Sequence, residues 1–96
     1  MKQSPIFTKT YDLLLWLIPQ TTKFPRQQRF VLAERVQQTA LRFQEQIVAA
    51  AYADDARSAL RAADVTLAQL RTYLRLCRDL ELLKFNQWEH AIRMVD

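Results

Sequence analysis

The sequence predicts an all-α protein, an antiparallel up-down-up-down four-helix bundle with two long central helices. The 96 residues include no glycine, and all three prolines lie within the first 25 residues, so the remainder lacks the residues that most often interrupt a helix. Hydrophobic residues recur every three or four positions and make up 50% of the chain, a pattern typical of amphipathic helices around one core. We therefore expect residues 1–96 to form a single domain.

The first helix is predicted to run from about Pro5 to Ile18 or slightly beyond. Ser4 suits its N-cap, and Pro5 suits its first turn. The residues expected on its inward face are Tyr11, Leu14, Leu15 and Ile18.

The second helix is predicted to begin after Pro25 and to end near Tyr52, with Phe30 among its inward residues. The third is predicted from Asp55 to about Leu83, because two acidic residues suit the start of a helix. Its apolar seam has the alternating three- and four-residue spacing of bundle helices. The seam residues are Leu60, Ala63, Leu67, Leu70, Leu74 and Cys77.

A short fourth helix is predicted near the end of the chain. Asn86 and Glu89 have the spacing of a capping box, with Asn86 as the N-cap. Trp88, Ile92 and Val95 then follow on one face of this helix.

Positive charge is concentrated in two tracts, although the net charge is only +4. Residues 23–42 and residues 57–78 each contain five basic residues and one acidic residue. At about 100° per residue, the five arginines of the second tract share one side of the third helix. Such a stripe is either a solvated surface with ion pairs or a surface for phosphates or an acidic protein. The candidate binding residues are Arg26, Arg29, Arg35, Arg42, Arg57, Arg61, Arg71, Arg75 and Arg78.

The first helix has more apolar residues than one inward face needs. Leu13, Trp16 and Leu17 are apolar in addition to its expected inward residues, so we expect these three at an interface between copies. The third helix has a minor apolar line of Val65, Leu76 and Leu83 away from its main seam. The alternative for both sets is burial in a wider core.

The sequence offers no catalytic, metal or cofactor site. Without glycine it has none of the glycine-dependent phosphate loops or nucleophile elbows. Cys77 is the only cysteine and His90 the only histidine, so one chain cannot supply a metal site of these residues. We expect Cys77 to be a buried thiol and His90 to be a surface or interface residue, and we expect no enzymatic activity.

The cellular location is expected to be the cytoplasm. A single cysteine allows no intrachain disulfide, which favours a reducing compartment. The longest apolar run, residues 47–53, is too short to cross a membrane, and the first residues have no apolar segment of a secretory signal.

Two stretches resemble the accessory variability determinant (Avd) proteins of diversity-generating retroelements. One is residues 11–19, YDLLLWLIP; the other is residues 23–36, KFPRQQRFVLAERV. The distinctive core is Lys-Phe-Pro-Arg-x-x-Arg-Phe followed by Glu34 and Arg35. The resemblance covers roughly the first half of the chain. Four-helix-bundle proteins encoded by insertions in bacterial 23S ribosomal RNA genes share the general pattern.

The resemblance implies a homopentamer that binds the reverse transcriptase of the retroelement together with RNA or DNA. It implies an accessory role in mutagenic retrohoming without catalytic activity. At the matching motif, Arg26, Arg29 and Arg35 would contact the enzyme or the RNA, or would form ion pairs across the bundle. Two alternatives stay open: a protein of the 23S intervening-sequence type, and a structural self-assembling bundle without a nucleic-acid function.

Overall fold

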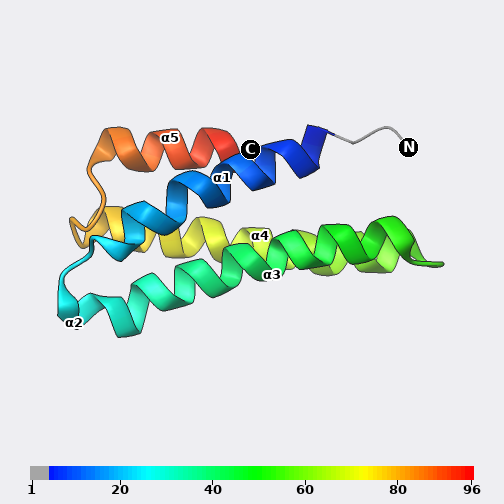
Figure 1. Ribbon diagram of the computed structural model, residues 1–96, viewed down its shortest axis with the longest axis horizontal. Helices are drawn as coiled ribbons and strands as arrows, with labels where there is room; N and C mark the ends of the chain where they lie inside the picture. The colour runs from blue at the N-terminus through cyan, green and yellow to red at the C-terminus, as the bar shows by residue number, and fades with distance from the viewer. Residues whose placement is uncertain (1–4) are drawn as a thin grey trace.

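The computed structural model describes residues 5–96 and confirms the all-α four-helix bundle, with no strand in this part of the chain (Figure 1). Its helices are α1 (Pro5–Thr22), α2 (Arg26–Gln28), η1 (Arg29–Ala33), α3 (Glu34–Tyr52), α4 (Ala56–Asp79) and α5 (Phe85–Val95). The segments α2, η1 and α3 follow one another directly and form the predicted second helix. The proposed cap Ser4 lies outside the described residues.

The two long helices form an antiparallel hairpin that organises the bundle. α3 and α4 lie side by side along most of the 42 Å length of the molecule (Figure 1). α1 packs against α3, and α5 packs against both α4 and α1. The closed end of the hairpin extends beyond α5 (Figure 1), so the outer turns of α3 and α4 have fewer neighbours than the turns near Phe24.

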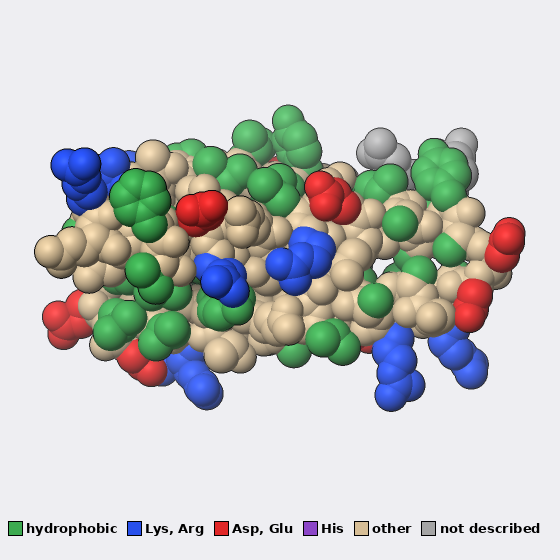
Figure 2. Space-filling view, turned by 90° about the horizontal axis from the view of Figure 1, so that it is seen from below, with side chains coloured by type: hydrophobic (Ala, Val, Ile, Leu, Met, Phe, Trp, Pro, Cys, Tyr) green, Lys and Arg blue, Asp and Glu red, His purple; other side chains and the backbone are tan. Residues whose placement is uncertain are grey.

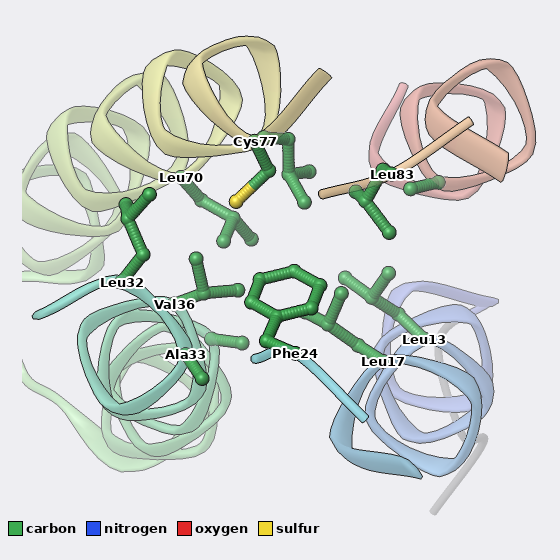
Figure 3. Close-up of a cluster of buried hydrophobic side chains, with 12 residues drawn as sticks. Leu13, Leu17, Phe24, Leu32, Ala33, Val36, Leu70, Cys77 and Leu83 are labelled. Carbon is green, nitrogen blue, oxygen red and sulfur yellow. The ribbon is translucent and has the colours of Figure 1, made fainter. Parts of the chain in front are cut away.

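The main core lies between all four helices. Figure 3 shows Leu17, Val36, Leu70 and Cys77 pointing toward a common centre that also holds the ring of Phe24. All of these side chains are buried. The predicted seam of α4 therefore faces the core from Ala63 to Cys77, whereas Leu60 at the outer end of the hairpin is exposed.

Four threonines are buried with the apolar residues. Each hydroxyl donates to the backbone carbonyl four residues earlier, at 2.6 to 3.2 Å. This local bond satisfies the hydroxyl inside its own helix, so the side chain enters the core without an unpaired polar group. The four residues are Thr10, Thr21, Thr39 and Thr66.

The predicted orientation of α1 is wrong. Its buried face consists of Thr10, Leu13, Leu17 and Thr21, and Leu13 and Leu17 are only 2% and 0% exposed. These two leucines, predicted at an interface between copies, belong to the core of their own chain, and Trp16 is half-buried beside it. The physical reason is that two threonines extend the Leu13–Leu17 face in both directions, from Thr10 to Thr21.

The residues predicted on the inward face of α1 accordingly lie outside. Tyr11 and Leu15 are 62% and 60% exposed, and Ile18 is also exposed. Leu14 is half-buried. The predicted surplus of apolar surface on α1 is therefore present, but different residues form it.

A π-helical segment, η1, lies within the Lys-Phe-Pro-Arg motif region. A π turn contains more residues than an α turn. The side chains before it are therefore rotated about the helix axis relative to those after it. Leu32 and Ala33 are buried here, whereas Phe30, predicted to face inward, is 75% exposed. The Arg29 guanidinium donates from Nε to the Phe24 carbonyl at 3.0 Å and holds the preceding connection against the helix.

α4 ends four residues before the predicted Leu83. Glu81 has a positive φ of 62°, and the N–H groups of Glu81 and Leu82 donate to the carbonyls of Arg78 and Cys77 at 2.9 and 2.8 Å. This is the Schellman arrangement that normally has glycine at the left-handed position. Leu83 lies beyond the turn and is buried.

The predicted cap of the last helix is also displaced. α5 begins at Phe85, and the Lys84 backbone N–H donates to Oε1 of Gln87 at 2.9 Å. Gln87, rather than Glu89, therefore reaches back to the start of the helix, and Asn86 is not the N-cap. At the other end of α4, the Ser58 N–H donates to Oδ1 of Asp55 at 3.2 Å, so Asp55 caps α4.

Thr21 provides a test of the buried threonines. Its hydroxyl bonds to Leu17 and also accepts from Nε2 of Gln37 at 2.8 Å, which links α1 to α3. We expect Thr21→Val to lower the free energy of unfolding by about 1 kcal/mol, because Gln37 loses its short hydrogen bond and keeps only the Thr22 hydroxyl at 3.5 Å. Thr39→Val is the matched control and should change stability less, since that hydroxyl bonds only to Arg35 of its own helix. Equal losses in urea denaturation would contradict the assignment.

Glu81 provides a second test. Glu81→Gly should raise the free energy of unfolding by about 1 kcal/mol, because glycine adopts a positive φ without steric cost. Glu45→Gly in the middle of α3 is the control and should lower stability by about 1 kcal/mol through its poor helix propensity. Thermal and urea unfolding of the two variants measure both effects. A loss of stability in Glu81→Gly would show that the left-handed turn is not the one described.

Candidate nucleic-acid interface

The five arginines of α4 lie along the outer part of this helix but differ in their surroundings. Arg57, Arg61 and Arg75 are exposed, and within residues 5–96 no acidic side chain forms an ion pair with them. Guanidinium groups that are always charged and lack a partner are suited to bind phosphate oxygens. These three form the freest part of the predicted stripe.

The other two arginines of α4 are engaged with α5 and its neighbours. Nε of Arg71 lies 2.9 Å from Oδ1 of Asp96. Arg78 pairs with Asp79 at 2.9 Å, and its guanidinium lies 4.3 Å from the centre of the Trp88 ring. A cation over an aromatic face is stabilising, so Arg71 and Arg78 help to hold α5 on α4.

The arginines of the first tract are divided between two places. Arg26 and Arg29 lie at the start of the second helix, where Arg29 is committed in part to the Phe24 carbonyl. Arg35 and Arg42 are exposed on α3, seven residues apart and therefore on one side of it. Figure 2 shows the basic side chains of the molecule in several places: in the middle of the view, along its lower edge and at its upper left corner. The nine predicted residues thus form several groups rather than one site.

Acidic residues reduce the positive charge of α4 only locally. Asp64 lies between Arg61 and the second half of the arginine row. Asp79 and Glu81 lie at the end of the helix, where Asp79 already pairs with Arg78. The arginines of α4 without an ion pair therefore lie toward both ends of the helix, with Arg57 and Arg61 near its start and Arg75 one turn before its end.

Cys77 and His90 lie in different surroundings. Cys77 is buried, and desolvation raises the pKa of its thiol from 9.0 to about 11, so it stays protonated and unreactive near neutral pH. His90 is exposed, and its ring lies 4.9 Å from that of Trp16. No three His, Cys, Asp or Glu side chains of the described chain gather where they could hold a metal ion.

The apolar surface of α1 and α3 is the feature that sequence reasoning misplaced. Tyr11 and Val48 line one groove between these helices, with Phe7 and Leu14 beside them. The signal in the sequence was the regular spacing of Thr10, Leu13, Leu17 and Thr21. This spacing places the four residues on one face of α1, which is the buried face. The contact of Arg71 with Asp96 joins residues 25 positions apart, and no local pattern indicates it.

The family follows from a match over nearly the whole sequence rather than from the motif alone. The model of the bAvd-like family matches residues 5–96, which include all the helices of the bundle. The chain belongs to the bAvd-like family. A search of curated proteins gives no match. For this bAvd-like chain the resemblance to Avd proteins is thereby confirmed, and the match extends it across the second half of the sequence.

The family is one of accessory, non-catalytic proteins. In this bAvd-like chain the groups available on the described surface are guanidinium groups on α4 and apolar side chains on α1 and α3, which suit binding and packing. None of the described helices combines the length and apolar character that crossing a membrane requires.

Proposed function

We propose that the protein is a non-catalytic accessory subunit of a diversity-generating retroelement. In this role it binds the reverse transcriptase and the template RNA or cDNA and supports mutagenic retrohoming. The observation that supports this most strongly is the row of exposed arginines on α4, without acidic partners in residues 5–96, in a member of the bAvd-like family.

The spacing of these arginines suits a nucleic-acid backbone. Arg57 and Arg75 are 18 positions apart, about 27 Å along a helix. A surface of this length spans several phosphates. Binding of this kind releases counterions and therefore weakens steeply as salt rises. It positions a nucleic acid without reading its sequence, which suits an accessory subunit.

We further propose that the protein works as a homo-oligomer, with five copies as the resemblance implies. The exposed apolar residues of α1 and α3 support self-association, because contiguous exposed apolar patches mark interfaces. The number five rests on the resemblance to Avd proteins. The docking of the reverse transcriptase likewise rests on the resemblance.

A structural bundle without nucleic-acid binding is the second candidate. The observation in its favour is that Arg71 and Arg78 serve internal contacts. In that case the other arginines would form a solvated surface. The same would hold for a protein of the 23S intervening-sequence type that does not bind RNA. The two candidates differ in whether RNA affinity depends on particular arginines.

Charge reversal on α4 tests the proposal. We expect Arg57→Glu/Arg75→Glu to weaken binding to a structured RNA at least about tenfold, and to reduce the steepness of its salt dependence by about two released counterions. Lys9→Glu/Lys84→Glu changes the net charge equally, on α1 and just before α5, and should have a much smaller effect. Fluorescence anisotropy across a salt series measures both.

Two results would contradict the proposal. Equal losses in the two double variants would mean that net charge alone attracts RNA. Absence of RNA binding by the unchanged protein at low salt would favour the structural bundle. Copurification with the reverse transcriptase of the same retroelement tests the protein partner separately, and its failure would remove that part of the proposal.

A further inference from the structure

Two separate apolar faces lie on the surface of the bundle. The first, here the α1–α3 face, combines exposed residues of both helices beside a groove of about 610 Å³. In α3 its residues are seven positions apart, so they share one side of the helix. The face consists of Tyr11, Leu15, Ile18, Leu41 and Val48.

The second, here the α3–α4 face, lies on the other flank of α3. Val65, Leu76 and Leu80 are exposed on α4, next to a hollow of about 310 Å³ that Val65 lines with Thr72 and Tyr73. Helical spacing places Val65 and Leu76 within about 20° of each other around α4. Arg35 and Arg42 of α3 complete this face.

Contacts within the chain fix the positions of the two faces relative to each other. Gln37 bonds to Thr21 of α1, so its side of α3 is the one that faces α1. Leu41 and Val48 lie on that flank, whereas Arg35 and Arg42 lie about 120° away around the helix, toward α4. A surface that covers one face therefore leaves the other open.

The two faces carry opposite charges. Glu34 and Glu45 are exposed near the α1–α3 face, with Glu45 one turn from Leu41. Arg35 and Arg42 lie on the α3–α4 face. None of these four side chains has an ion-pair partner in the described part of the chain. Figure 2 shows acidic side chains between the hydrophobic upper edge and the basic middle of the molecule.

We propose that the α1–α3 face of one copy packs against the α3–α4 face of the next copy, head to tail. This rests on the self-assembly in the proposed function and names the surfaces that form it. Pairing of unlike faces sets acidic borders against arginines, whereas pairing of like faces would oppose equal charges. A contact between two different patches leaves one free face at each end of a pair, so further copies add until the assembly closes.

The arrangement also separates two groups of arginines. Arg35 and Arg42 are covered by the neighbouring copy. Arg57 and Arg75 lie about 90° away from Val65 and Leu76 around α4, so they remain open to RNA. Variants of the two groups should therefore affect different measurements: assembly for the first group and RNA affinity for the second.

Complementation between single-face variants tests the head-to-tail contact. Tyr11→Glu removes the α1–α3 face, and Val65→Glu removes the α3–α4 face; these residues are 62% and 57% exposed, so both variants should fold. We expect each variant alone to be monomeric by light scattering, with self-affinity reduced about tenfold or more. Mixed together, they should form a pair of two copies, because each retains the face that the other lacks.

Phe85→Glu is the matched control. Phe85 is 62% exposed on α5, outside both faces, so this variant should assemble like the unchanged protein. Circular dichroism of each variant verifies that it is folded.

Each outcome decides the proposal. If Val65→Glu assembles normally while Tyr11→Glu does not, the contact joins two identical faces and the head-to-tail arrangement is wrong. If both variants are monomeric and their mixture stays monomeric, the two faces do not meet. A monomeric unchanged protein would remove both this inference and the assembly part of the proposed function, while leaving the RNA measurement independent.

Discussion

The packing of α1 depends on how threonine satisfies its hydroxyl. Thr10 and Thr21 donate to carbonyls of their own helix at 2.6 and 2.9 Å, so they enter the core like small apolar residues. Together with Leu13 and Leu17 they make one continuous buried face from Thr10 to Thr21 on α1. The larger apolar residues Tyr11 and Leu15 are consequently left on the surface. The exposed apolar residues of α1 are thus the ones that its buried face excludes from the core.

The arginines serve different purposes according to their neighbours. Arg29 fixes the connection after α1 through the Phe24 carbonyl, and Arg71 and Arg78 hold α5 against α4. Surface ion pairs such as that of Arg71 contribute little stability individually. These contacts nevertheless determine which guanidinium groups stay available for binding. The remaining arginines of α3 and α4 are therefore the ones whose charge is directed outward, toward a neighbouring copy or a nucleic acid.

Periodicity was sufficient where a helix has one clear apolar face. The fold class, the continuous second helix and the α4 seam from Ala63 to Cys77 follow from spacing alone, and the stretches at residues 11–19 and 23–36 indicated the family that the match over residues 5–96 shows. Periodicity failed for α1 because apolar residues occur on both sides, and the deciding threonines look polar in sequence. It also failed at Glu81, since a left-handed turn without glycine has no sequence signal. At Phe30 it failed because a π turn changes the helical spacing of the residues.

Hydroxyl-radical footprinting of the unchanged protein, at concentrations below and above assembly, tests the central claim most directly. The account predicts that Leu13 and Leu17 resist oxidation at both concentrations. Tyr11 should react when the protein is dilute and become protected when it is concentrated, while Phe85 reacts at both. Oxidation of Leu13 and Leu17 in the folded dilute protein, or a Tyr11 that reacts equally at both concentrations, would contradict the account.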